Sequence, residues 1–581
     1  MIASDLRRAE FLFDSVMDAW RRDGRSSVKA SELLSQAQQQ ATRNGQTVQA
    51  HRAGLHWCFL RMGMSGRGAC ADADIRQHQD ALLRSGLPKL ALEAEFLMAR
   101  IQRLEGQSDN ALGMLENLID EIRFYRQTLP GVLGAWYWQT KAELFQEFMA
   151  ITLEQSGSTS QKPVDGTRAV LALDRIRLIE ADERSTAGGI VDQRQDESLR
   201  ALLAQREAAS GSEAESLARQ AGGELQALRN VFEPAVSPLN PASLEKLLAG
   251  LSSNESLLTY YFSESADYAL IGNRQSMSLL MLSGATTVAA RLGEIRDNVS
   301  RSSTPVISEL DFMGRFLVKP VLGMLTRKLY LLPAGPLNGF PFNALRVDGR
   351  FLAETHDVVN LMNLSSVAGN RAVLKQGYAD RVFLAGSPQS SRELFSYDVQ
   401  ASPEITSMTD RFVGPGLHII QGVALNREEF RDDRFTEAGL IHLAIPGTID
   451  LAFPDRSGLL MSQTGNDPAI RNLSPLDIRG LDFKAVLAVL SQTTTVGANR
   501  SDFDSRMGFV SDFLDGGVEN VLVSFWFDES SGSVDFLRKF YAELGATGDI
   551  AEALSITRNA RLKSGDEANF RSWAGFQLFI R

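Results

Sequence analysis

The sequence predicts an α/β protein, in which an all-α region precedes a doubly wound, mainly parallel sheet. In roughly the first 230 residues, apolar side chains recur every three or four positions, which is the period of an α-helix. From about residue 250, short apolar runs alternate with amphipathic segments, and each run is continuously apolar, as in a strand buried on both faces. We expect helices over 1–155, a helical connector with polar breaks over 156–249, and the sheet domain over 250–581, with its core at 310–581.

The composition is typical of a globular protein with two or three domains. The chain has 581 residues, of which 44% are hydrophobic and 23% are charged. Its net charge of −11 argues against nucleic acid as the main partner, because phosphate binding needs clustered basic groups. The N-terminal residues lack a basic head followed by an apolar run, and no apolar stretch approaches the roughly 18 residues that cross a bilayer. We therefore expect no membrane span and a cytoplasmic location.

The helical region contains the only two cysteines and a weak repeat pattern. Two cysteines in a chain of this length do not make a disulfide scaffold, so we expect Cys58 and Cys70 to be a core thiol and a loop thiol. Glycine and proline at 85–89 and 128–134 predict short turns between antiparallel helices. The spacing of Ala99, Gly106, Ala111 and Leu115 fits a tetratricopeptide unit, with a generic helical bundle as the alternative.

The apolar runs of the second half predict a hairpin followed by buried strands. The hairpin is expected over 258–272, and the strands are expected at 328–335, 381–388, 440–447, 485–492 and 520–526. In a parallel sheet, ligand and catalytic loops follow the carboxyl ends of the strands. The loops after these runs are therefore where we look for chemistry.

Several of these segments, taken in order, resemble the CHAT family. They include LYLLPAGPLNGFPFNAL at 329–345, LIHLAIPG at 440–447, AVLAVLSQTTTVG at 485–497 and WAGFQLFI at 573–580. The resemblance covers roughly residues 250–581. It implies a caspase-like cysteine peptidase fold, in which a thiolate attacks the scissile carbonyl and an imidazole handles the leaving-group proton.

The resemblance also implies that both catalytic groups are missing. It puts the family's histidine position at Pro446 and its cysteine position at Thr493. Proline cannot exchange a proton near neutral pH, and a threonine hydroxyl is a poor nucleophile without an adjacent base. The resemblance thus implies a former active-site cleft formed by His442, Pro446, Gly447, Ser491, Gln492, Thr493, Thr494, Thr495 and Asp528.

Other side chains are weak substitutes for the missing groups. His442 lies four residues before Pro446, roughly 13 Å back along the strand, so we expect it to be structural. We expect His418 to be structural and His356 to be exposed. Asp450, Asp502 and Asp504 are acids near the two loops, but such loop acids are more often solvated or capping residues. Asp528 either lines the cleft or caps the following helix.

Three functions remain open at this point. The first is a catalytically inactive pseudo-peptidase that binds protein partners as a scaffold or regulator, with an active CHAT-type peptidase or its substrate as partner; family analogy suggests a bacterial defence or cell-death pathway. The second is a hydrolase that uses Thr493 or Ser491 as nucleophile. The third is a helical scaffold with a C-terminal dimerisation block. The sequence has no GxxxxGK[ST], HExxH or paired CxxC motif, so we predict no cofactor and no metal.

Overall fold

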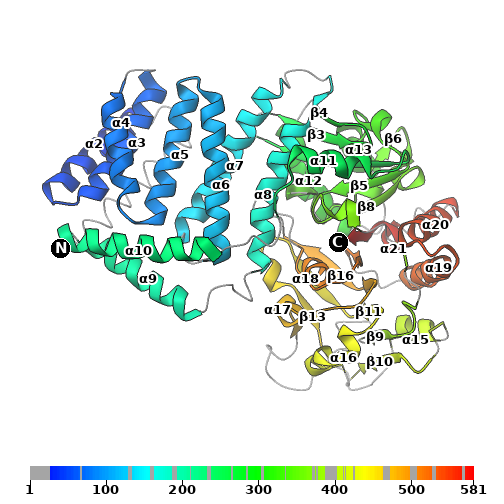
Figure 1. Cartoon of the computed structure of the whole chain (residues 1–581). Helices are drawn as coiled ribbons and strands as arrows, with labels where there is room; N and C mark the ends of the chain where they lie inside the picture. The colour runs from blue at the N-terminus through cyan, green and yellow to red at the C-terminus, as the bar shows by residue number, and fades with distance from the viewer. Residues whose placement is uncertain are drawn as a thin grey trace. The chain divides into compact units, whose positions relative to one another are not determined.

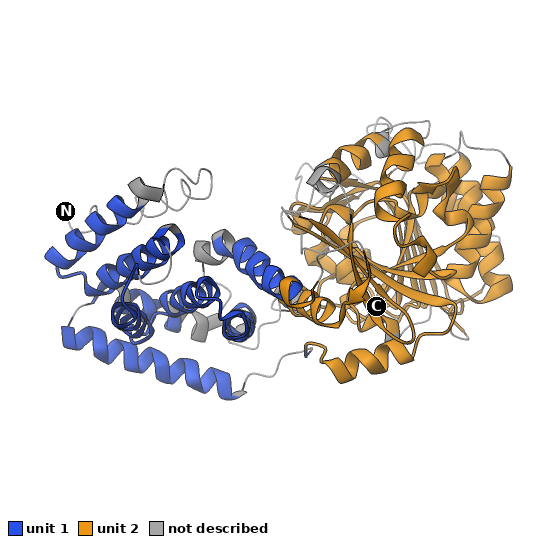
Figure 2. Ribbon diagram, turned by 90° about the horizontal axis from the view of Figure 1, so that it is seen from above, with its two compact units in different colours: residues 1–153, 188–237 blue, residues 154–187, 238–581 orange. Residues whose placement is uncertain are grey.

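The computed structural model divides the chain into two units (Figure 2). The helical unit contains residues 1–153 and 188–237, and the sheet unit contains residues 154–187 and 238–581. The segment that we predicted as a connector, 156–249, is thus shared between the units. The structure describes residues 27–65, 69–128, 134–157, 162–185, 193–209, 211–231, 237–263, 266–282, 286–301, 307–333, 335–369, 373–374, 377–386, 402–409, 411–412, 414–422, 425–461, 472–497, 507–526, 531–564 and 570–581.

Helices that follow one another along the chain form the helical unit (Figure 1). Gly106 has a φ of 78° in the turn between two of these helices, a conformation that favours glycine. Ala99, Ala111 and Leu115 are fully buried on the same two helices. Whether they form a tetratricopeptide unit remains a prediction. The helices are α2 (Ser27–Arg43), α3 (Thr47–Ser65), α4 (Asp72–Leu83), α5 (Pro88–Leu104), α6 (Ser108–Thr128), α7 (Gly134–Gln155), α9 (Gln193–Ala208) and α10 (Gly211–Val231).

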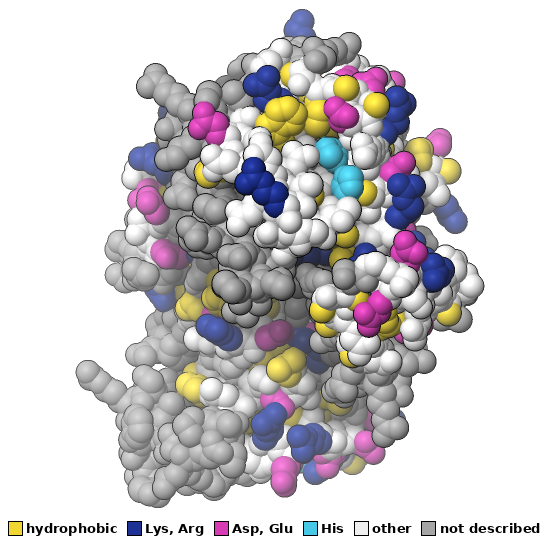
Figure 3. All heavy atoms as spheres, turned by 90° about the vertical axis from the view of Figure 1, so that its left-hand side faces the viewer, with side chains coloured by type: hydrophobic (Ala, Val, Ile, Leu, Met, Phe, Trp, Pro, Cys, Tyr) yellow, Lys and Arg dark blue, Asp and Glu magenta, His cyan; other side chains and the backbone are white. Residues whose placement is uncertain are grey.

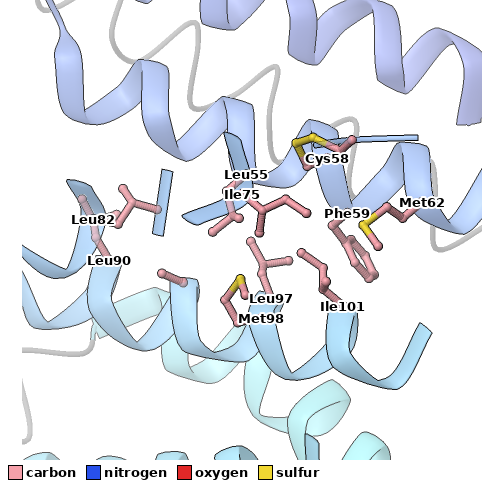
Figure 4. Packing of buried hydrophobic residues seen from close by; sticks show 12 residues of the cluster. Leu55, Cys58, Phe59, Met62, Ile75, Leu82, Leu90, Leu97, Met98 and Ile101 are labelled. Carbon is pink, nitrogen blue, oxygen red and sulfur yellow. A yellow bond between two sulfur atoms is a disulfide. The ribbon is translucent and has the colours of Figure 1, made fainter. Parts of the chain in front are cut away.

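Apolar side chains from α3, α4 and α5 form a core in this unit (Figure 4). Leu55 and Phe59 of α3 pack with Leu82 of α4 and with Leu97 and Ile101 of α5. The spacing of four residues between Leu55 and Phe59, and between Leu97 and Ile101, puts each pair on one face of its helix, as the periodicity predicted. Each fully buried leucine or phenylalanine contributes roughly 1.5–3 kcal/mol by leaving water.

The two cysteines are joined in a disulfide, so the expectation of two separate thiols was wrong. Cys58 lies on α3 and Cys70 lies two residues before α4, and their Cα atoms are 5.4 Å apart. Both side chains are buried within the same apolar core. The pairing could not be predicted from the sequence, because only the packing of α3 beside α4 brings the two positions within bonding distance.

A buried charge cluster links α3 to α5. Oε1 of Glu93 accepts a hydrogen bond from Nε of Arg52 at 2.7 Å and another from Nε2 of His56 at 2.6 Å. Burial alone would raise the pKa of Glu93, but the positive charge of Arg52 and the bonds from both partners lower it to about 2. Burial also lowers the pKa of His56. We therefore treat the pair as a carboxylate that accepts from a neutral imidazole, with its charge balanced by Arg52.

A twelve-stranded sheet forms the centre of the sheet unit, with the order β1-β4-β3-β2-β5-β8-β18-β17-β15-β11-β9-β10. The predicted hairpin is confirmed, since Leu258 of β2 pairs with Ile271 of β3 in an antiparallel ladder. The strands are β1 (Val164–Asp165), β2 (Glu255–Phe262), β3 (Asp267–Gly272), β4 (Met277–Leu282), β5 (Lys328–Leu332), β8 (Asp357–Leu361), β9 (Val382–Gly386), β10 (Leu417–Gln421), β11 (Leu440–Ala444), β15 (Leu487–Leu490), β17 (Asn520–Ser524) and β18 (Phe576–Ile580).

Most neighbouring strands from β2 to β10 are parallel, as the continuously apolar runs predicted. The exceptions are the antiparallel strands at the β1 end and the antiparallel pair of β17 with β18. Because β18 is parallel to β8, the strands on its two sides run in opposite directions. The ends of β11, β15 and β17 consequently meet at one edge of the sheet.

Helices of the sheet unit occur between the strands along the chain, as in a doubly wound sheet (Figure 1). No helix among the described residues is long and apolar enough to cross a bilayer. The α-helices described in the sheet unit are α8 (Thr167–Ser185), α11 (Pro241–Ala249), α12 (Thr286–Arg301), α13 (Ile307–Leu317), α14 (Ser366–Gly369), α15 (Pro403–Thr409), α16 (Asp433–Thr436), α17 (Pro475–Ile478), α18 (Phe509–Asp515), α19 (Ser531–Thr547), α20 (Ile550–Lys563) and α21 (Phe570–Ala574).

Candidate functional site

The two loops singled out in the sequence lie side by side beyond the main sheet. Strands β11 and β15 are parallel neighbours, with His442 opposite Val489. Beyond their ends the chain continues as β12 (Gly447–Asp450) and β16 (Thr493–Val496), which pair in parallel in a second sheet of order β14-β13-β12-β16. The other two strands of this sheet are β13 (Gly458–Leu460) and β14 (Asn472–Leu473).

Pro446 and Thr493 are brought together by this pairing. Gly447 pairs with Thr493, and the backbone N–H of Gly447 donates to the carbonyl of Gln492 at 3.2 Å. The carbonyl of Pro446 accepts from the N–H of Leu460 at 2.8 Å. A Cβ at Gly447 would lie 2.5 Å from the carbonyl oxygen of Gly458, so only glycine allows β13 to approach this closely. The loop after β11 is therefore fixed on both sides.

The hydroxyl of Thr493 is used in a structural hydrogen bond. Its side chain is fully buried, and Oγ1 donates to the carbonyl of Ser524 at 2.6 Å. Thr495 is also buried and donates from Oγ1 to the carbonyl of Phe525 at 3.0 Å. A peptide carbonyl is not a base that can activate a hydroxyl. These contacts attach β16 to the end of β17 and give the Thr493 oxygen no catalytic partner among the contacts described.

The opposite face of β12 and β16 is directed outward. Thr448 is exposed, Thr494 opposite it is half-buried, and Val496 is 38% exposed. Asp450 at the end of β12 accepts from the N–H groups of Ala452 and Phe453 through Oδ1, both at 2.9 Å, so this acid caps a turn. Phe453 is 40% exposed and lies under the guanidinium of Arg456, 4.2 Å from the ring centre. We call Thr448, Asp450, Phe453, Thr494 and Val496 the outer face.

His442 points into a buried polar cluster. Its Nε2 lies 2.7 Å from Oε1 of Glu404, and its Nδ1 lies 2.7 Å from the hydroxyl of Tyr541. Because a carboxylate only accepts hydrogen bonds, Nε2 carries the hydrogen that Glu404 accepts. Gln492 Nε2 donates to the second oxygen of Glu404 at 3.0 Å. The contacts described for His442 thus lie within this buried cluster, and its structural role remains a prediction.

Burial and hydrogen bonding together set the protonation of this cluster. Burial alone would raise the pKa of Glu404, but hydrogen bonds and the charge interaction from His442, with bonds from Ser491 and Gln492, bring it below its ordinary value. Burial and the nearby Glu404 raise the pKa of the Tyr541 hydroxyl well above its ordinary value. The glutamate is thus held as a carboxylate, and the tyrosine is held as a neutral phenol.

The cluster includes a serine, a histidine and an acid but not the geometry of a nucleophilic triad. Oγ of Ser491 lies 3.5 Å from Nε2 of His442, the nitrogen that already donates to Glu404. In a triad the acid orients one ring nitrogen and the nucleophile uses the other. Ser491 is 4% exposed, His442 is 0% exposed and Glu404 is 2% exposed, so a substrate does not reach them in this structure.

The remaining residues named in the sequence lie apart from this cluster or outside the described residues. His418 on β10 packs against Phe383 and lies 3.1 Å from Nη1 of Arg434. His356 is half-buried rather than exposed, and its Nδ1 lies 2.8 Å from the hydroxyl of Thr355. Asp502, Asp504 and Asp528 lie outside the described residues. Glu404 and Tyr541 were missed, because nothing in their local sequence links them to His442.

The described residues contain no group of three or more His, Cys, Asp or Glu side chains placed to hold a metal ion. The groups that line β12 and β16 are threonine hydroxyls, backbone groups and the capping carboxylate of Asp450. Such groups can recognise an extended peptide through hydrogen bonds. They do not supply an acid and base pair for peptide hydrolysis.

The sheet is mainly parallel, and the two candidate loops follow the ends of adjacent strands. This arrangement defines an α/β domain of the kind that the resemblance to the CHAT family implied. Residues 308–580 match the family model of the CHAT domain, so the chain contains a CHAT domain. Most of the sheet unit lies within this match, including β11, β12, β15 and β16.

Among solved structures, the chain is similar to one from the Saccharomyces cerevisiae separase–securin complex. The two are 8% identical with a TM-score of 0.38, and the match covers 96% of this chain and 49% of the other. The chain thus spans about half the length of that relative, and we draw no conclusion about function from the similarity. A search of curated protein sequences found no match.

Proposed function

We propose that this protein is a pseudo-peptidase, a CHAT-domain protein that binds protein partners instead of cutting them. One observation supports this most directly. At the positions where the resemblance puts the catalytic pair, Pro446 and Thr493 lie next to each other, neither has an ionisable side chain, and the Thr493 hydroxyl is buried against the carbonyl of Ser524. The scaffold or regulator role, the cytoplasmic location and a bacterial defence or cell-death pathway are parts of the same proposal.

The outer face is the surface that we assign to partner binding. Val496 and Phe453 expose apolar side chains there, with the exposed Thr448 and the half-buried Thr494 beside them. Val496 pairs with Asp450, and Phe453 follows three residues later, so the apolar groups flank one strand end. Apolar groups bordered by hydrogen-bonding groups suit an extended segment of a protein, for which an active CHAT-type peptidase or its substrate is the partner that we propose.

A binding experiment with matched variants tests this surface. Full-length protein is immobilised and exposed to a purified active CHAT-type peptidase and to its substrate. Val496→Lys should weaken binding at least tenfold, because a charge replaces an apolar contact in the outer face. Val373→Lys is the matched control, since this valine is 50% exposed elsewhere in the sheet unit. Equal binding by the two variants would remove the outer face from the proposal.

A hydrolase remains the second candidate because of one contact, the 3.5 Å distance between Oγ of Ser491 and Nε2 of His442. A fluorophosphonate probe distinguishes the two functions. The pseudo-peptidase should show no labelling and no turnover of a peptide library, and Ser491→Ala and Thr493→Val should behave like the unaltered chain. Labelling that Ser491→Ala or Thr493→Val abolishes would establish a nucleophile and contradict the pseudo-peptidase.

A further inference from the structure

A cavity in the helical unit contains two facing histidines that the CHAT domain does not explain. It has a volume of about 490 Å³ and lies between α2, α3 and α4, with His51, Trp57, Asp74 and His78 among its lining residues. On the face drawn in Figure 3, histidine side chains gather at one place on the surface. Both imidazoles are half-buried, so the pair is held by the protein and remains open to solvent.

The two imidazole rings face each other through their Nδ1 atoms. Nδ1 of His51 lies 2.9 Å from Nδ1 of His78, and the ring planes are inclined by 62°. Only one of these nitrogens can carry the hydrogen of the bond, so the other presents its lone pair. Gly54 leaves room for His78, because a Cβ at that glycine would lie 2.4 Å from Nε2 of His78. The packing of α3 beside α4 thus brings two potential nitrogen ligands together.

We propose that His51 and His78 bind one divalent transition-metal ion of the zinc class at this cavity. Imidazole nitrogen is a favoured ligand of zinc, copper and nickel. Zn–N bonds of about 2.0–2.1 Å in a tetrahedral site require the two nitrogens to be about 3.3 Å apart. Side-chain adjustments of a few tenths of an ångström at each ring would take the present 2.9 Å to that distance. The ion would replace the hydrogen that the two rings now share.

Asp74 is the third ligand that we assign. It precedes His78 by four residues on α4, so the two side chains lie on the same face of the helix. Its charge acts on His78, whose pKa it raises against the larger lowering caused by burial. No three ligating side chains of the described residues are already in place. The exposed Asp74 side chain must therefore change rotamer, and water fills the remaining position in the cavity.

Burial keeps the two imidazoles in the neutral form that can act as metal ligands. None of the described residues that line the cavity is a lysine or arginine. Burial lowers the pKa of both histidines, with Arg84 adding to the effect at His51 and His51 adding to it at His78. Neutral imidazoles are the form that binds metal, so few protons need to be displaced near neutral pH. A bound ion would connect α3 to α4 close to where these helices already share a core.

Metal titration of the full-length, tag-free and chelator-stripped protein tests the proposal. Isothermal titration with Zn²⁺ should give one ion per chain, with a dissociation constant in the micromolar range. His51→Gln and His78→Gln should each weaken binding about tenfold or more, and Asp74→Asn should weaken it severalfold. The matched controls are His418→Gln, in the sheet unit, and Asp72→Asn, an exposed acid on α4 that does not line the cavity.

A second measurement separates loss of a ligand from loss of the fold. Zn²⁺ should raise the unfolding temperature of the unaltered chain and of both controls but not of His51→Gln or His78→Gln, provided that far-UV circular dichroism shows all of them folded. An ion that binds only the native state stabilises it by mass action. Absence of Zn²⁺ binding to the unaltered chain, or binding that neither histidine substitution weakens, would overturn the proposal and leave the pair as a hydrogen bond between helices.

Discussion

Each unit buries a glutamate against a histidine, but the two carboxylates are held by different partners. In the helical unit, Glu93 accepts from His56 and from the guanidinium of Arg52 on the same oxygen. In the sheet unit, the bonds described for Glu404 come from His442, Ser491 and Gln492, and none of these is an arginine or a lysine. The first carboxylate is compensated by a permanent charge, whereas the second relies on hydrogen bonds centred on a histidine.

The two clusters therefore differ in the side chain whose loss would be most destabilising. Removing one partner from a buried charged group is far more destabilising than the pair is stabilising, because the remaining charge cannot return to water. For Glu93, Arg52 supplies the charge and His56 supplies an extra bond. For Glu404, His442 is the partner on which the remaining bonds depend. The contacts described for His442 thus give it a role in holding a buried carboxylate, which needs no catalysis.

The largest expected effect is in the sheet unit. His442→Leu should lower the free energy of unfolding by about 4 kcal/mol, because Glu404 is left buried with only Ser491 and Gln492 as partners. Urea-dependent hydrogen exchange of peptides from β11 and β15 measures this locally. The double variant Glu404→Leu/His442→Leu removes the stranded charge and should recover most of the loss. A single variant that loses less than about 1 kcal/mol would show that Glu404 does not depend on His442.

Acid should destabilise the helical unit by about 3 kcal/mol. The pKa of Glu93 is about 2 in the folded state against an ordinary value of 4.5, so the unfolded chain takes up the proton first. This stabilisation is therefore complete above about pH 5 and is lost as the pH falls towards 2. Hydrogen exchange of α3 and α5 peptides between pH 5 and pH 2.5, corrected for the intrinsic pH dependence of exchange, measures it. Stability of α3 and α5 that does not change over this range would contradict the assignment.

Glu93→Gln should cost about 2 kcal/mol at neutral pH. The amide oxygen still accepts from Arg52 and His56, but the charge that balances the guanidinium is lost. The same variant should also lose the acid dependence just described, which makes it the control for that titration. Chemical unfolding followed by the fluorescence of Trp57, which packs against the α3 core, reports on this unit. An unchanged acid dependence would assign the effect to another carboxyl group.

The smallest expected effect is that of Tyr541→Phe, about 1 kcal/mol. The variant removes the hydroxyl that lies 2.7 Å from Nδ1 of His442 but keeps the ring that packs edge-on against Phe412. Urea unfolding of the sheet unit measures the loss. A loss as large as that of His442→Leu would mean that Tyr541, and not the histidine, organises the cluster.

The main strands could be predicted because strands buried on both faces consist of consecutive apolar residues. The runs that became β5, β9, β11, β15 and β17 are apolar at nearly every position, since each strand is covered on both faces. The resemblance then supplied the order of the loops. It also put Pro446 and Thr493 on adjacent loops, where the structure has them paired through Gly447.

The details of the site could not be predicted, because they depend on contacts between distant segments. Glu404 lies 38 residues before His442, and Tyr541 lies 99 residues after it. The strands β12 and β16 are four residues long, and TTTV is as typical of a loop as of a strand until its partner is known. The Cys58–Cys70 bond could not be predicted for the same reason, since a separation of 12 residues does not show that two side chains are close until the helices are packed.

That bond has a consequence for where the protein can keep its full stability. By the chain-entropy argument, a cross-link closing a loop of this size removes conformations from the unfolded chain and stabilises the fold by about 3 kcal/mol. Cytoplasmic thiol buffers normally keep such pairs reduced. In that compartment the α3–α4 region would lose this covalent link, and moving the protein to an oxidising environment would stabilise the helical unit while leaving the CHAT domain as it is.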